Sequence, residues 1–298
     1  MSKMKAIEIN GLTKMYKDKA AVKNVHLEVN EGEIFGFIGP NGAGKSTTIK
    51  ALLNFIYPTS GSAKILGLDS VKDSKAIKRE VSYVSSDVRF YPAMTASEII
   101  GYAAEFHQIQ DAEAKIKHYY DRFEIESNKK LGDMSLGNKK KVAIVAGLIA
   151  EPKLMILDEP SSGLDPLMQH RLFEILTEKN KSGMTVFLSS HDLMEVQNYC
   201  SKAAFIKDGE LIRIEDIDKD KADGKVVQLR GKNLNGTEFI KKGATIIEST
   251  TSSLKFIYNG DLQLILPLFV NSSITDIIIK NQDLEDKFMA MYEGGKKA

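Results

Sequence analysis

The sequence has one cysteine, no tryptophan and almost no net charge. The single Cys200 excludes an internal disulfide framework and is typical of a reducing compartment, so we expect it to be a small buried apolar side chain. A net charge of +1 creates no field that favours nucleic acid as a partner. No stretch reaches the roughly eighteen apolar residues of a membrane-spanning helix, and residues 1–10 lack the apolar region of a signal peptide. We therefore expect a chain on the cytoplasmic side of the membrane, and any membrane role must come from a separate polypeptide.

Length and composition predict two packed domains. The 298 residues exceed one average domain, and 43% hydrophobic with 27% charged residues exclude a disordered or fibrous chain. The composition changes after Ile214, because residues 215–225 are mostly charged and lack apolar periodicity. We therefore predict a first domain at 1–214, a linker at 215–225 and a second domain at 226–298.

Three apolar segments of the first domain are predicted strands with polar groups at their carboxyl ends. Residues 33–38 lead into a glycine-rich turn, residues 153–157 end in two carboxylates, and residues 184–189 end just before a histidine. Uniformly apolar strands are typical of a parallel sheet that is covered on both faces. Because ligands gather at the carboxyl edge of open α/β sheets, we expect these three strand ends to form one site.

The other predicted elements complete an α/β domain and a smaller α+β domain. Residues 95–124 have helical spacing, with Thr95 as N-cap and Glu98 completing a capping box, which predicts a helical insertion within about residues 88–150. The second domain has the strand-helix-strand-strand-helix-strand order of a ferredoxin-like fold. Further strands are predicted at 5–10 and 25–29, and the second-domain elements at 226–230, 237–242, 245–249, 254–258, 262–270 and 275–280, with a last helix at 284–292.

Residues 39–46 read GPNGAGKS between an apolar strand and a helix. Glycines let the backbone curl so that its N–H groups point at phosphate oxygens, and the helix presents its positive end to them. Lys45 supplies a cation for the β and γ phosphates, the Ser46 hydroxyl is a predicted Mg²⁺ ligand, and Thr47 can assist. A plain glycine turn with the same four fixed residues arises by chance in about one chain in a hundred of this length. The predicted ATP-binding residues of this loop are Gly39, Pro40, Asn41, Gly42, Ala43, Gly44, Lys45, Ser46 and Thr47.

Two carboxylates and a histidine follow the other two apolar strands. Adjacent side chains at the end of a strand point in different directions, so Asp158 is the predicted metal ligand and Glu159 the group that orients and polarises the attacking water. A neutral His191 can hydrogen-bond a γ-phosphate oxygen. In other contexts such a pair is usually a solvated loop start, and a lone histidine is usually a surface or core residue. Their place after a phosphate loop favours catalysis by Glu159, His191 and Lys45.

These residues, in this order, resemble the nucleotide-binding domain of ABC transporters over roughly residues 5–215. The segment MSLGNKKKV at 134–142 is similar to the signature motif of that family. The resemblance implies a P-loop NTPase fold with a RecA-like core, an antiparallel β subdomain and a helical subdomain, together with ATP hydrolysis. It also implies that Ser135 and Gly137 bind the γ-phosphate of ATP held by a facing domain. Leu136 and Asn138 depart from the commoner glycine and glutamine. We interpret residues 139–141 as a solvated helix face in preference to direct contacts with phosphate.

The resemblance assigns three further positions. The segment SSGLD at 161–165 resembles the D-loop, which implies that Asp165 lies at the dimer seam. Tyr16 matches the aromatic residue that stacks on adenine, and such stacking requires only a π-face. The family normally has a glutamine that reaches the metal and the γ-phosphate where this chain reads YVSSDVRF, with Ser86 at that position. Asp87 or a bridging water is our hypothesis for the missing contact.

Residues 274–295 resemble the C-terminal ending of ATP-binding subunits of antibiotic, bacteriocin and toxic-peptide exporters. We therefore predict an ATP-hydrolysing subunit that pairs with a second nucleotide-binding domain, either a copy or a paralogue, and drives export through a separate membrane permease. A second domain that caps the dimer or stabilises the chain fits the sequence equally well. One alternative is a soluble ABC ATPase acting on ribosomes or DNA, which usually has two cassettes or a long coiled coil. Another is a regulatory module that binds ATP without turnover, and the sequence does not name the cargo.

Overall fold

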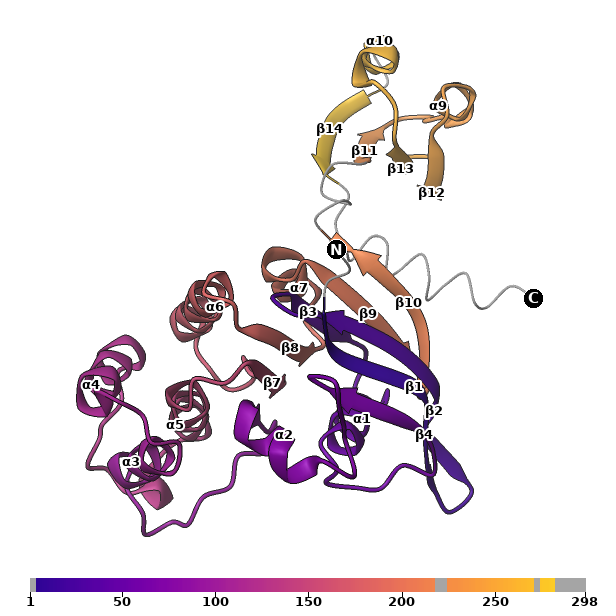
Figure 1. The fold of residues 1–298 in the computed structure, drawn as a ribbon. Helices are drawn as coiled ribbons and strands as arrows, with labels where there is room; N and C mark the ends of the chain where they lie inside the picture. Colours follow the sequence, from indigo (N-terminus) through magenta and orange to yellow (C-terminus); the bar gives the residue numbers. More distant parts are fainter. Residues whose placement is uncertain (1–3, 218–223, 271–273, 282–298) are drawn as a thin grey trace. The chain divides into compact units, whose positions relative to one another are not determined.

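The computed structural model describes residues 4–217, 224–270 and 274–281 (Figure 1). The chain divides into two compact units, Met1–Glu215 and Asp216–Ala298. None of the helices within the described ranges has the length and apolar character needed to cross a membrane. The helix predicted at 284–292 lies outside the described residues.

The first unit contains a six-stranded sheet and a four-stranded antiparallel sheet. The six-stranded sheet has the order β10-β9-β3-β8-β7-β6, in which β3 pairs in parallel with β8 and β9, and β7 with β6 and β8. Its strands are β3 (Ile34–Ile38), β6 (Val81–Val84), β7 (Leu154–Asp158), β8 (Thr185–Ser190), β9 (Lys202–Lys207) and β10 (Glu210–Asp216). The second sheet is formed by β1 (Lys5–Tyr16), β2 (Lys19–Asn30), β4 (Ser60–Ile65) and β5 (Leu68–Asp69), in the order β2-β1-β4-β5. The predicted α/β class with an antiparallel β subdomain is confirmed.

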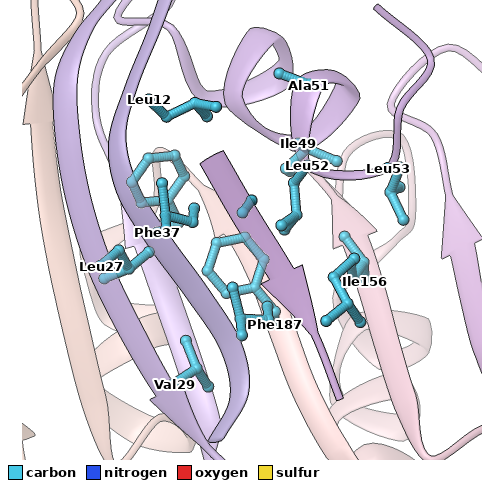
Figure 2. Packing of buried hydrophobic residues seen from close by; sticks show 14 of the residues in the cluster. Leu12, Leu27, Val29, Phe37, Ile49, Ala51, Leu52, Leu53, Ile156 and Phe187 are labelled. Atoms are coloured by element: carbon cyan, nitrogen blue, oxygen red, sulfur yellow. The ribbon is translucent and has the colours of Figure 1, made fainter. Parts of the chain in front are cut away.

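The three central strands are apolar because they are covered on both faces. Every residue of β3, β7 and β8 is buried. The rings of Phe37 and Phe187 lie 5.6 Å apart between centroids, and Figure 2 shows Leu27 of β2 and Leu52 of α1 in the same cluster. One hydrophobic core therefore joins the antiparallel sheet, the parallel strands and the first helix.

The strand predicted at 5–10 continues much further along the chain. Gly11 has a φ of 62°, and the pairing of β1 with β2 shifts register between Ile9 and Leu12. Such an irregularity bends a strand without ending it, so β1 runs on to Tyr16. The alternation of apolar residues is broken at the glycine, and for this reason the sequence pattern showed only the first half of the strand.

The helices of the first unit lie around the sheets (Figure 1). The predicted helical stretch at 95–124 consists of two helices, since Gln108 and Asp111 both have left-handed backbone conformations. Thr95 is confirmed as an N-cap: its Oγ1 accepts from the Glu98 N–H at 3.2 Å, and Glu98 Oε2 accepts from the Thr95 N–H at 2.8 Å. The helices are α1 (Lys45–Leu52), α2 (Ser74–Glu80), α3 (Ala96–Phe106), α4 (Ala112–Phe123), α5 (Leu136–Ile149), α6 (Pro166–Lys181) and α7 (Leu193–Tyr199), with a 3₁₀ turn at Leu131–Asp133.

The second unit has the predicted β-α-β-β-α-β order of elements. Its antiparallel strands lie in the order β12-β13-β11-β14 around a core that includes Leu229, Phe239 and Phe256. The helix predicted at 262–270 is a 3₁₀ turn, Leu262–Leu264, followed by a short α10 that has Pro267 in its first turn. Proline is accepted at the start of a helix but not in its interior, which explains the interruption. The other elements are β11 (Lys225–Gly231), α9 (Thr237–Lys241), β12 (Thr245–Ser249), β13 (Ser253–Tyr258), α10 (Leu266–Phe269) and β14 (Ile274–Asn281).

Candidate active site

The phosphate-loop sequence lies between β3 and α1, and its backbone approaches neighbouring strands too closely for larger residues. A Cβ at Gly39 would lie 2.3 Å from the Ile206 carbonyl oxygen, and one at Gly44 would lie 2.5 Å from that of Ala21. Gly44 also has a φ of 108°, which L-residues with side chains rarely adopt. These two glycines are therefore required by the packing of the loop itself. Of the other loop residues, Ala43 is buried, Ser46 and Thr47 are partly buried, and Pro40, Asn41 and Gly42 are exposed.

Lys45 is the buried cation of this loop. Its side chain is only 6% exposed, and its Nζ donates to the carbonyl oxygen of Gly39 at 2.6 Å and to that of Pro40 at 3.3 Å. The same Nζ forms an ion pair with Glu159 Oε1 at 3.0 Å. Lys45 is therefore held by loop carbonyl oxygens and a carboxylate. Its flexible side chain can exchange these contacts for a phosphate oxygen while it stays in the site.

Glu159 lies at the centre of the site. Its Oε2 is 2.6 Å from His191 Nδ1 while its Oε1 faces Lys45, so residues from three different strand ends meet at one carboxylate. The backbone of Glu159 has a φ of 50°, an uncommon conformation for a residue other than glycine. Its N–H donates to the Ser189 carbonyl oxygen at 3.2 Å and to Ser189 Oγ at 3.1 Å. Backbone strain that is held by surrounding hydrogen bonds is often found at active sites.

Asp158 points away from Glu159, as predicted for adjacent residues at a strand end. Its side chain is fully buried, with Oδ1 accepting from Ser189 Oγ at 2.6 Å and Oδ2 from Ser86 Oγ at 3.2 Å. In the part of the chain that the structure describes, both hydrogen-bond partners of Asp158 are hydroxyls, and no lysine or arginine forms an ion pair with it. The buried Lys140 ammonium interacts electrostatically with Asp158 but forms no ion pair with it, and a buried carboxylate without a paired cation fits a site that receives a cation together with its ligand.

The side chains that could ligate a metal suit Mg²⁺, which takes only part of its ligands from protein. Among residues 4–217, 224–270 and 274–281, no group of three or more His, Cys, Asp or Glu side chains could hold a metal ion. Mg²⁺ is usually held through one or two carboxylates together with water and phosphate oxygens. One buried carboxylate, Asp158, and the predicted Ser46 hydroxyl match that requirement.

Ser86 itself reaches the predicted metal ligand, since its hydroxyl donates to Asp158. Asp87, the other candidate for the missing contact, is exposed and forms an ion pair with Arg89 at 2.7 Å. Ser189 is a contact that sequence reasoning missed, because a hydroxyl at the end of an apolar strand has no distinctive spacing. It bonds both the Asp158 carboxylate and the Glu159 backbone N–H, and thereby ties the end of β7 to β8.

The signature-like segment begins helix α5. Ser135 is the N-cap, and its Oγ accepts from the Asn138 N–H at 3.2 Å. Asp165 caps α6 in the same way, with Oδ1 accepting from the Met168 N–H at 3.0 Å. The side chains of Ser135 and Asp165 are exposed. Each of these cap bonds joins a side chain to the backbone of its own helix, so neither contacts Lys45 or His191. Their predicted roles toward a facing chain stay predictions.

The interpretation of residues 139–141 as a solvated helix face is wrong for two of the three lysines. Lys140 is fully buried and Lys141 is 8% exposed. The following residues of α5, VAIVAGLI, are apolar on all sides of the helix, and such a helix is buried all round. That continuous apolar sequence indicates a buried helix, but it does not by itself show that the adjoining lysines are buried.

Tyr16 ends β1 and is 51% exposed. Lys14 Nζ lies 5.2 Å from the centroid of its ring. An exposed aromatic face is what base stacking requires, and stacking of Tyr16 on adenine stays a prediction.

Gly137 is expected to tolerate no side chain. An alanine Cβ there would lie 2.3 Å from the Gly163 carbonyl oxygen of the D-loop-like segment. We expect Gly137→Ala to destabilise the protein by about 1–3 kcal/mol, because backbone must move to relieve the clash. Gly101→Ala in α3 is the matched control: nothing lies within 4 Å of its Cβ, and loss of a helical glycine should stabilise the protein by about 0.5–1 kcal/mol. Thermal unfolding of both variants measures the effects, and a stabilised Gly137→Ala would contradict the contact.

This chain is similar to known ATP-binding proteins of ABC transporters. The family model described as ABC transporter matches residues 22–162. The uncharacterised ABC transporter ATP-binding protein YcbN of Bacillus subtilis (strain 168) is 33% identical over 263 residues, which cover 87% of this chain and 80% of that protein. The bacitracin transport ATP-binding protein BcrA of Bacillus licheniformis is 36% identical over 212 residues, or 69% of this chain and 68% of that protein. A dimeric ATP-binding cassette, solved in a post-hydrolysis state with ADP and Pi, is 25% identical with a TM-score of 0.65, covering 71% of this chain and 98% of that one.

Proposed function

Because this chain belongs to the family of ABC transporter ATP-binding proteins, we propose that it hydrolyses ATP to drive export through a separate membrane permease. It is an ABC-type ATPase with the P-loop fold. The observation that carries the proposal is the meeting of Lys45, Glu159 and His191 at the carboxyl edge of three parallel strands. Export is supported by the similarity to a protein named for bacitracin transport and by residues 274–295, and the cargo is accordingly an antibiotic-like or peptide molecule.

The residues of the site divide the work of phosphoryl transfer to water. The loop amides of residues 39–46 and Lys45 bind and orient the triphosphate. Glu159 accepts a hydrogen bond from the attacking water and holds it in line with the γ-phosphate. His191, held by Glu159 at 2.6 Å, can contact a γ-phosphate oxygen. Magnesium, when held by Asp158 and Ser46, would neutralise charge on the β and γ phosphates.

A second nucleotide-binding domain completes the site in this proposal. Helix α5 begins beside the exposed Ser135, and the positive dipole end of a helix suits the γ-phosphate of a nucleotide held by a facing chain. Closure of the two chains on ATP would move the permease, and hydrolysis would let them separate. The facing chain is a second copy or a paralogue, and the assembly acts on the cytoplasmic side of the membrane.

The proposal is tested by purification from membranes. We expect the chain to co-purify with a membrane-spanning partner and to hydrolyse Mg-ATP, with turnover stimulated by the exported antibiotic or peptide. ATP binding without turnover, even beside the membrane partner, would favour a regulatory module. Co-purification with ribosomes or DNA in place of a membrane protein would favour the other alternative.

Replacing Ser86 with glutamine, the usual family residue, is expected to keep ATP turnover within about threefold of the parent protein, because the amide retains a donor for Asp158. The Ser86 side chain is partly exposed, so the longer side chain has room. Ser86→Ala is the control, since it removes the 3.2 Å bond to a buried carboxylate and should lower turnover more than Ser86→Gln. Steady-state ATPase rates decide the question, and a collapse of Ser86→Gln to background would show that the glutamine position of the family is not equivalent here.

A further inference from the structure

Lys140 is a fully buried lysine with three hydrogen bonds to backbone. Its Nζ donates to the carbonyl oxygens of Ser85 at 3.3 Å, Ser86 at 3.1 Å and Glu159 at 3.0 Å. A lysine ammonium has three donors, and here each of them has an acceptor. Lys140 therefore connects helix α5 to the segment after β6 and to the segment after β7.

Burying this ammonium is costly. The dipoles of the three carbonyl groups and the charge of nearby carboxylates offset part of the cost. Burial lowers the pKa of Lys140, while neighbouring carboxylates, Asp158 foremost, act in the opposite direction. Removing the ammonium alone would leave its carbonyl acceptors without these hydrogen bonds. A cation whose every donor is bound to the backbone of catalytic segments suits a positioning role.

Lys140 contacts the backbone of Glu159, a residue with an uncommon backbone conformation. Glu159 has a left-handed backbone, with a φ of 50°, and such a conformation persists only where neighbours fix it. Ser189 accepts the hydrogen bond from the Glu159 N–H, and Lys140 donates to the Glu159 carbonyl oxygen on the other side of the residue. The Glu159 carbonyl oxygen also accepts from the Ser162 N–H at 3.3 Å. The backbone of Glu159 is thus held from β8, from α5 and within its own loop, while Lys45 and His191 contact its carboxylate.

We propose that Lys140 is a positioning residue for ATP hydrolysis, which fixes the Glu159 backbone and the Ser85–Ser86 segment to helix α5. The inference rests on the proposed function for the role of Glu159. Through this contact, the helix that begins at Ser135 is tied to the hydrolytic carboxylate of its own chain. A shift of α5 would therefore shift Glu159 relative to the water that it orients.

The direct test is Lys140→Met, which keeps the length and bulk of the side chain and removes its donors. We expect kcat to fall at least about thirtyfold, with KM for ATP changed less than threefold, because the reacting geometry is altered and nucleotide binding is not. Lys141→Met is the matched control. Lys141 is the next residue of α5, is also buried, and its Nζ lies 3.5 Å from the Glu124 carbonyl oxygen, away from the catalytic segments. Its kcat should stay within twofold of the parent protein.

A second comparison separates positioning from a general structural effect. In a Glu159→Gln background, Lys140→Met should reduce the residual rate by less than about twofold, since residues that act as a unit are not additive. An equal proportional loss in both backgrounds would overturn the proposal, as would a kcat for Lys140→Met within threefold of the parent protein.

Hydrogen exchange tests the same contact without relying on turnover. Lys140→Met should speed amide exchange of Asp158 and Glu159 by about tenfold or more, and Lys141→Met should not. Unchanged exchange in Lys140→Met would also overturn the proposal. If the parent protein shows no ATP turnover, the proposed function fails, and the exchange comparison alone decides whether Lys140 positions this segment.

Discussion

Glu159→Gln is expected to lower ATP turnover by about 10²–10³-fold while ATP binding is retained. The amide keeps the shape of the side chain but is a poor acceptor for the proton of the attacking water. It also ends the ion pair with Lys45 and changes the contact with His191, and the freed lysine can bind phosphate more strongly. We therefore expect ATP to accumulate on the variant and to hold pairs of chains in a closed dimer, measured by size-exclusion chromatography with and without ATP.

Glu33→Gln is a matched control for this prediction. Glu33 is also a buried carboxylate, but it precedes β3, whose other end leads into the phosphate loop, and it bonds Asn30 and Lys202. Its replacement should weaken the fold while kcat stays within about twofold of the parent, since it lies at the opposite edge of the sheet from the site. Full turnover in Glu159→Gln would remove Glu159 from its assigned role.

Lys45→Met is expected to weaken ATP binding by at least about a hundredfold and to abolish turnover. The change removes the cation placed for the phosphates, and charge-assisted contacts with phosphate are among the stronger hydrogen bonds in proteins. It also leaves Glu159, which is 14% exposed, without its ion pair. Fluorescence titration with a nucleotide analogue measures the affinity.

Lys50→Met, on the exposed last turn of the same helix, is the control for Lys45→Met. Its nucleotide affinity should match that of the parent protein, because surface substitutions away from a site rarely change it. A Lys45→Met protein that binds ATP within threefold of the parent would contradict the assignment of residues 39–46 as the phosphate site.

The position of the site could be predicted from the sequence because parallel strands share one carboxyl edge. Lys45 is more than a hundred residues from Glu159 and His191 along the chain, yet each of the three follows an apolar strand. The strand order β3-β8-β7 brings them together, as the topological rule requires. Gly39 and Gly44, the two glycines that the phosphate-loop pattern fixes, are also positions where an added Cβ would clash with backbone.

The supporting contacts of the site could not be predicted in the same way. The role of Ser189 depends on a hydroxyl that bonds the Asp158 carboxylate and the Glu159 N–H of the neighbouring strand end, and a single serine carries no periodic signal. Lys140 looked like a surface residue because charged runs are usually solvated. Its burial follows from three backbone acceptors that residues 85–86 and 159 supply, and these come together only in the folded chain.

A crystal structure of the Glu159→Gln protein with Mg-ATP tests the central claim most directly. The account predicts a triphosphate cradled by residues 39–46, with a γ-phosphate oxygen about 2.7–3.2 Å from Lys45 Nζ and from the imidazole of His191. It also predicts that the start of helix α5 in a facing chain reaches the same γ-phosphate. A nucleotide bound elsewhere on the protein, or one whose γ-phosphate touches neither Lys45 nor His191, would contradict it.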